Sequence, residues 1–82
     1  MKLMLIEWED SHSGRGWHDL DDIKKTAEPL RCRSVGWLAA SNDECRLLVP
    51  HLGGETQDNS QGCGDMVIPV RAIIKETELA QP

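Results

Sequence analysis

The sequence lacks several features that would place it in a familiar class of protein. It contains no Phe and no Tyr, and its aromatic residues are Trp8, Trp17 and Trp37. No apolar run approaches the roughly 18–20 residues that a membrane span requires, so we expect no contact with a membrane. The apolar stretch at 1–6 is too short for a secretion signal and is followed directly by Glu7. These absences predict a cytoplasmic protein.

Basic residues are also few. Nine Lys and Arg stand against fourteen Asp and Glu, which gives a formal net charge of −5. A non-specific grip on nucleic acid or on an anionic membrane needs a basic surface, so this balance argues against both. The 82 residues make a single domain, 1–82. A chain of this size buries only about 60% of its unfolded surface, which favours association with further copies.

No group of side chains has the spacing of a known metal site or catalytic motif. Structural zinc sites contain two Cys only two to four residues apart, whereas Cys32, Cys45 and Cys63 are widely separated. Catalysis by Cys63 would need a base beside the thiol, and His18 or His51 would reach it only through folding. The acidic segment 7–22 matches neither a zinc nor a calcium motif and is interpreted as a solvated loop. We therefore expect no catalytic residue, no metal and no cofactor.

Alternating apolar residues predict a mainly β chain. Leu3–Glu9 has the pattern of a strand, with Met4, Ile6 and Trp8 on one face. Near the other end of the chain, Met66–Ile68 and the residues from Ile73 onward are predicted strands. Between them Pro69 interrupts the pairing, and the segment 70–72 is expected to form one 3₁₀-like turn.

A short helix is predicted at 20–27. Asp19 can cap its N-terminus, and Leu20 and Ile23 begin an apolar stripe along one side. A helix this short is not stable alone. We therefore expect Leu20 and Ile23, together with Trp17 just before them, to dock the helix on the rest of the domain.

The central segments Leu30–Ala40 and Cys45–Leu52 are predicted to form a hairpin. A turn centred on Asn42 and Asp43 would place Leu38 opposite Leu47 and Gly36 opposite Val49. Both faces of this hairpin are apolar, whereas an antiparallel sheet with one wet side alternates cleanly. We expect one face to be covered by the core and the other by the helix or by another subunit. The polar segment 53–65 is predicted to be a loop.

About five short strands and one short helix suggest a small barrel, because closure removes exposed edges. Several segments resemble a group of small phage and prophage-encoded proteins, some of them Sm-like proteins with an open SH3-like barrel. The segments that carry this resemblance are Trp8–Asp10, Gly16–Asp19, Ser34–Leu38 and Val67–Lys75.

The resemblance implies both an assembly and the residues that build it. Sm-like proteins form rings by pairing edge strands of neighbours, which implies a cyclic homo-oligomer of about five to seven subunits. The residues expected in the subunit interface or the core are Val35, Trp37, Leu48, Ile68 and Ile73.

The leading hypothesis is a non-catalytic, phage-type accessory or interaction protein whose partners are its own copies and a protein or RNA. Binding of single-stranded RNA is the alternative, although the candidate loops 41–44 and 53–65 contain acids and no Lys or Arg. A weak basic patch would need Arg31, Arg33, Arg71 and Lys75 to converge. A small metal- or thiol-dependent enzyme is the third hypothesis.

Overall fold

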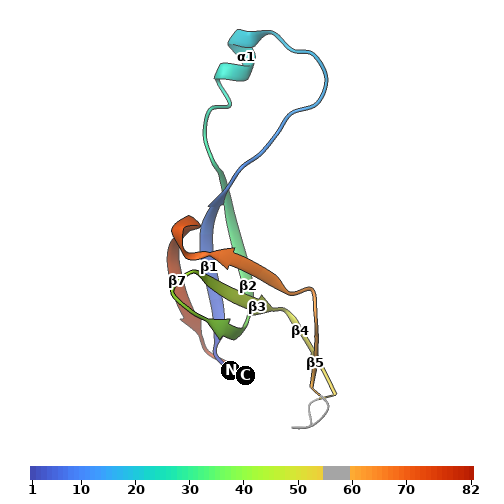
Figure 1. Ribbon diagram of the computed structural model, residues 1–82, viewed down its shortest axis with the longest axis vertical. Helices are drawn as coiled ribbons and strands as arrows, with labels where there is room; N and C mark the ends of the chain where they lie inside the picture. Colours follow the sequence, from blue (N-terminus) through green and yellow to red (C-terminus); the bar gives the residue numbers. More distant parts are fainter. Residues whose placement is uncertain (55–59) are drawn as a thin grey trace.

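The computed structural model describes residues 1–54 and 60–82 and is mainly β, as predicted (Figure 1). Five strands form an antiparallel sheet in the order β6-β3-β2-β1-β7, and β4 and β5 form a second, two-stranded sheet. The elements are β1 (Leu3–Asp10), α1 (Leu20–Lys24), β2 (Leu30–Ser41), β3 (Cys45–Val49), β4 (His51–Gly53), β5 (Gln61–Cys63), β6 (Met66–Pro69), the 3₁₀ turn η1 (Val70–Ala72) and β7 (Ile73–Leu79). Because β6 and β7 lie at opposite edges of the described sheet, the sheet does not close into a complete barrel.

The core lies on one face of the five-stranded sheet. Met4 and Ile6 of β1 are buried there, and Trp8 packs against the same cluster, which confirms the face predicted from the alternation. Leu48 of β3 and Ile68 of β6 complete the cluster. Leu38 and Ile73 pack around it.

The sheet curls strongly around this core. Ile6 and Ile68 are both fully buried in one cluster, although two strands separate β1 from β6. Arg46 of β3 also forms an ion pair with Glu76 of β7, with Nε 2.8 Å from Oε1. In a flat sheet these two strands would lie about 14 Å apart, at roughly 4.8 Å per strand. The ion pair therefore joins parts of the sheet that only curvature brings together.

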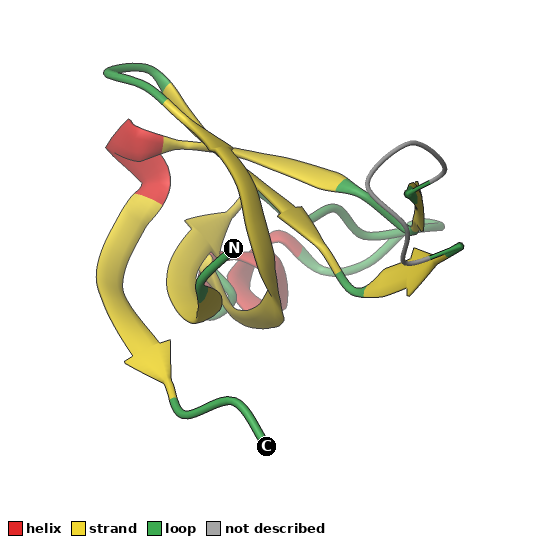
Figure 2. Ribbon diagram, turned by 90° about the horizontal axis from the view of Figure 1, so that it is seen from below, coloured by secondary structure: helices red, strands yellow, loops and turns green. Residues whose placement is uncertain are grey.

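The predicted 3₁₀ turn is confirmed. Figure 2 shows η1 turning the chain from β6 into β7 at one side of the molecule. The backbone N–H of Val70 donates to the carbonyl oxygen of Glu44 at 2.8 Å, which ties η1 to the turn between β2 and β3. The two edge strands thus come from one continuous segment of chain.

The hairpin of β2 and β3 has a different register from the predicted one. Leu38 lies opposite Leu48 rather than Leu47, and a bulge follows before Ala40 pairs with Leu47. The side-chain oxygen of Asn42 accepts the backbone N–H groups of residues 44 and 45, at 2.8 and 2.9 Å. This Asx-type turn moves the centre of the hairpin one residue onward, and the bulge absorbs the offset.

The strand predicted over Cys45–Leu52 is also divided. It leaves the main sheet at Pro50, which has no backbone N–H to donate, and continues as β4. β4 pairs with β5, so His51 lies opposite Cys63. The predicted loop 53–65 therefore contains the end of β4 and the strand β5, and its part at 55–59 lies outside the described residues.

The residues between β1 and β2 form a projecting arm, defined here as residues 11–29 (Figure 1). α1 stands at its tip, well away from the sheet, and the molecule measures 55 × 25 × 24 Å. The prediction that Trp17, Leu20 and Ile23 dock the helix on the domain is wrong within the single chain. Their exposed fractions are 102%, 64% and 47%.

The physical reason lies in the length of the β1–β2 ribbon that carries the arm. The two strands remain paired as far as Asp10 and Leu30, and ion pairs of Arg33 with Glu7 and of Arg31 with Glu9 connect them. α1 itself begins after Asp19, as predicted, but the Asp19 side chain makes no capping hydrogen bond, and its carbonyl oxygen accepts the first helical N–H groups. It ends at Lys24 rather than at residue 27, because the next N–H groups bond to carbonyls only three residues back.

Gly36 lies in close contact with the backbone of the neighbouring strand β3. A Cβ at this buried position would lie 3.1 Å from the Val49 carbonyl carbon and 3.2 Å from its nitrogen and oxygen. We expect Gly36→Ala to lower the free energy of unfolding by about 1–3 kcal/mol, since backbone cannot move aside as a side chain can. Urea denaturation measures the effect. Gly53→Ala is the control, because its Cβ meets nothing within 4 Å; equal losses would contradict the prediction.

A second prediction concerns the ion pair across the curled sheet. Arg46 and Glu76 expose only 20% and 32% of their side chains, and Arg46 Nη1 also donates to the Asn42 carbonyl at 2.6 Å. A double-mutant cycle of Arg46→Met and Glu76→Gln should give a coupling free energy of about 1 kcal/mol. The matched cycle on the exposed pair of Lys2 and Glu78, 3.6 Å apart, should give a value near zero. Equal coupling in both pairs would show that the curvature gives Arg46 no advantage.

Candidate functional site

The two free edges of the sheet are the first candidate site. β6 and β7 each have one neighbour in the described sheet, so their outer N–H and C=O groups are available to another strand. Both edges also expose apolar side chains: Val67 and Met66 on β6 are 60% and 43% exposed, and Ile74 on β7 is 49% exposed. Such strands are templates for pairing with another chain.

The hollows beside the two edges differ in the charged side chains that border them. A hollow of about 750 Å³ beside β6 is bordered by Asp43 and Glu44, with Arg71 as its single base. A hollow of about 340 Å³ beside β7 is bordered by three bases and one acid: Arg31, Arg33, Lys75 and Glu7. Arg31 and Arg33 are ion-paired with Glu9 and Glu7, so the bases beside β7 are largely neutralised. Three of the four cations named as a possible basic patch meet beside β7, whereas Arg71 lies beside β6.

The outer face of the sheet is the second candidate. Val35 is 52% exposed and Trp37 is half-buried, and both lie on the face opposite the core. In the register of β1 and β2 they stand opposite Leu5 and Leu3. The five residues expected in the core or the interface thus fall into two groups. Leu48 and Ile68 belong to the core, and Ile73 packs against it. Val35 and Trp37 are not part of the core.

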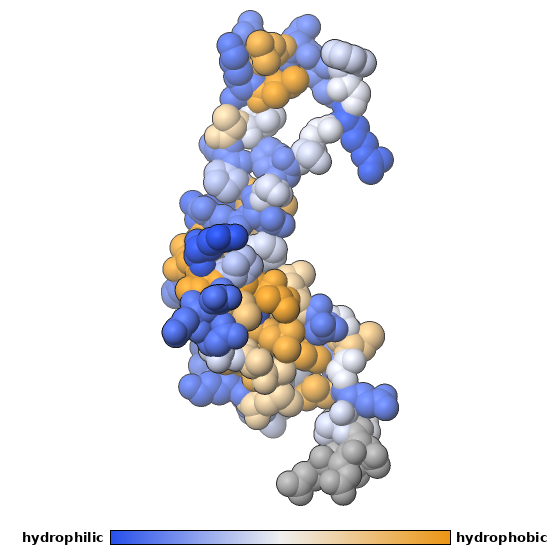
Figure 3. All heavy atoms as spheres, in the orientation of Figure 1, coloured by the Kyte–Doolittle hydropathy of each residue, from blue (hydrophilic) through white to orange (hydrophobic). Residues whose placement is uncertain are grey.

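Apolar side chains gather in two places on the surface seen in Figure 3. One group covers the curled sheet, and the other lies at the tip of the arm around α1. The second group includes Leu20 and Ile23, which the structure leaves exposed. The sequence placed these residues on an apolar stripe but gave no sign that the stripe would be carried away from the sheet.

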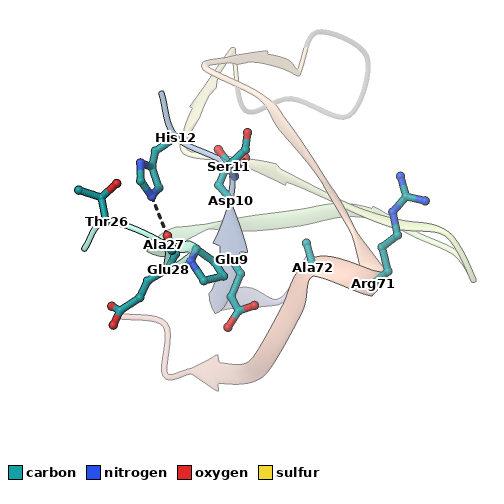
Figure 4. A pocket seen from close by; sticks show the side chains of 10 residues that line it. Glu9, Asp10, Ser11, His12, Thr26, Ala27, Glu28, Arg71 and Ala72 are labelled. Atoms are coloured by element: carbon teal, nitrogen blue, oxygen red, sulfur yellow. Dashed lines mark hydrogen bonds between the residues drawn. The ribbon is translucent and has the colours of Figure 1, made fainter. Parts of the chain in front are cut away.

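A hollow of about 590 Å³ lies at the base of the arm (Figure 4). Asp10, Ser11 and His12 border it on one side and Glu28 on the other. His12 Nε2 lies 2.6 Å from the Glu28 carbonyl oxygen, so this nitrogen donates to the backbone. In Figure 4 the Arg71 side chain points away from His12. The arrangement fastens the two legs of the arm together and brings no base to the Ser11 hydroxyl.

The thiols and imidazoles are dispersed. Cys32 and Cys45 are half-buried and Cys63 is exposed, and all three are free. Among residues 1–54 and 60–82 no three or more His, Cys, Asp or Glu side chains lie together as a metal site would require. The pairing of β4 with β5 does bring His51 opposite Cys63. The sequence gives no indication that His51 and Cys63 are neighbours, because the polar composition of residues 53–65 predicts a loop.

None of the described helical segments is long and apolar enough to traverse a lipid bilayer. Comparison of the chain with protein-family models, with curated proteins and with solved structures found no match.

Trp37 provides a test of the outer face. Its half-buried indole lies opposite Leu3 on β1 and Val49 on β3. We expect Trp37→Ala to lower the free energy of unfolding by about 2 kcal/mol, roughly half the loss for a fully buried Trp. Chemical denaturation at a concentration where the protein is monomeric measures it. A loss above about 4 kcal/mol would place Trp37 in the core instead.

Proposed function

We propose that the protein is a non-catalytic interaction protein that assembles into a ring, with β6 of each copy pairing with β7 of the next. Its protomer fold in this proposal is an Sm-like, open SH3-like barrel. The role is that of a phage-type accessory protein, which presents several identical copies of its surface to a partner.

The connectivity of the sheet supports the proposed fold. The order β6-β3-β2-β1-β7, with a 3₁₀ turn joining the two edge strands, is similar to the closing feature of Sm-like proteins. The strong curl of the sheet around Ile6 and Ile68 agrees with it. The segment from Val67 to Lys75, which carries part of the sequence resemblance, contains this turn.

The difference between the two edges is the observation that carries the proposal. A contact between unlike surfaces is heterologous, and heterologous contacts close into rings when the rotation per subunit permits. Here the β6 edge offers unpaired backbone and apolar Val67, and the β7 edge offers unpaired backbone and apolar Ile74. The two edges belong to different strands and are complementary in hydrogen bonding and in apolar surface.

Binding of single-stranded RNA receives less support. Arg31 and Arg33 already lie 3.2 and 3.6 Å from the carboxylates of Glu9 and Glu7. The turn between β2 and β3 presents Asp43 and Glu44, whose charge repels phosphate. An enzymatic function receives no support from the hollow at the base of the arm, where His12 is bound to backbone.

The ring is tested by Val67→Lys. A lysine on the exposed β6 edge opposes strand pairing without touching the core. Wild-type protein at micromolar concentration should have a mass of about five to seven copies by native mass spectrometry. The variant should have the 9.2 kDa mass of one copy.

Leu30→Lys is the control for this experiment. Leu30 is similarly exposed, at 49%, but begins the interior strand β2, so this variant should keep the wild-type mass. Circular dichroism verifies that both variants remain folded. A wild-type protein of 9.2 kDa, or a Val67→Lys variant with unchanged mass, would refute the ring.

A further inference from the structure

The arm carries a second apolar surface that the rest of its own chain does not cover. Trp17 is fully exposed, and Leu20 and Ile23 of α1 are 64% and 47% exposed. Every residue from 10 to 31 is exposed, so the arm buries none of its own apolar side chains. The sheet of the same chain does not cover them, because the long β1–β2 ribbon holds α1 away from it (Figure 1).

The arm also contains a hollow of about 470 Å³. It is bordered by Gly14, Gly16, His18, Asp22, Ile23 and Thr26. Two of the bordering residues are glycines, and an added Cβ at Gly14 would meet nothing within 4 Å. The open space lies beside Trp17 in the chain, yet the exposed indole does not fill it.

An exposed indole and an empty, partly apolar hollow thus lie in the same arm of one chain. A twofold, isologous contact requires a self-complementary surface, in which each copy offers both the projecting group and the recess. We infer that the tip of the arm binds the arm of a second copy, with Trp17 of each entering the hollow of the other. This inference does not depend on the proposed ring.

The charges of the arm agree with a second copy as the occupant. Arg15 lies in the loop before Trp17, and Asp19 and Asp21 lie at the start of α1. No ion pair engages these three side chains within residues 1–54 and 60–82. In a twofold arrangement the base of each arm can face the acids of the other, so the same contact satisfies both.

The size of the contact limits its strength. An aromatic side chain buries about 150–250 Å², whereas specific stable interfaces bury about 1,200–2,000 Å² in total. The two indoles with Leu20 and Ile23 therefore make a weak contact between single arms.

The test uses the Val67→Lys chain, which removes the proposed ring contact and leaves the arm intact. Sedimentation equilibrium from tens of micromolar to about 1 mM should show a monomer–dimer equilibrium. Adding Trp17→Ala should weaken dimerisation at least about tenfold, as for a central Trp in an interface. Trp17→Phe, which keeps an aromatic ring, should stay within about threefold of the parent.

Leu30→Ala is the matched control, because Leu30 is 49% exposed but lies outside the arm; it should leave dimerisation unchanged. A parent chain that stays monomeric at 1 mM, or a Trp17→Ala chain that dimerises like Leu30→Ala, would overturn the inference. If Val67→Lys does not change the mass of the wild-type protein, the ring proposal alone has failed. The same Trp17 series in the wild-type chain then tests the arm.

Discussion

The burial of Ile6 and Ile68 in one cluster is the constraint on which the rest of this structure depends. These residues belong to strands that two others separate, so they meet only if the five-stranded sheet curls. Curvature in turn explains the close approach of Gly36 to the backbone of Val49 and the ion pair between Arg46 and Glu76. If the same strands formed a flat sheet, water would reach the side chains of the small core on the face where they lie.

A core of this size has a direct consequence for association. Few residues are fully buried, and the apolar side chains that the core cannot hold lie on the strand edges, on the outer face and at the arm. Val67 and Ile74 accompany unpaired backbone at the two edges, which makes these edges the sites where another strand stabilises most. Because the two edges are different strands, pairing of one with the other is a heterologous contact.

The arm follows another principle, because it has neither a core nor an edge. Its shape is held by the hydrogen bond from His12 to the Glu28 carbonyl and by the ion-paired ribbon below it. The apolar residues at its tip therefore contribute little to the stability of the single chain. Their presence on an otherwise polar projection is understandable if the arm acts in contacts between chains, with the edges and the arm serving two separate contacts.

Local patterns in the sequence were enough for the elements that depend on neighbouring residues. Alternation identified the core face of β1, Pro69 located η1 between the last two strands, and Asp19 marked the start of α1. In each case the residues that indicate the element lie within it or directly beside it. Leu48 and Ile68, which the sequence left between the core and a subunit interface, belong to the core cluster.

The conformation of single turns and contacts between distant residues governed the features that the sequence did not reveal. The side chain of Asn42 and the bulge after Leu38 set the register of the hairpin, and Pro50 sent β4 to pair with β5. Whether Leu20 and Ile23 would meet the sheet depended on how far β1 and β2 stayed paired, and hence on cross-strand contacts such as Arg31 with Glu9. Periodicity shows which side of an element is apolar; the distance from that side to the next surface is a property of the folded chain.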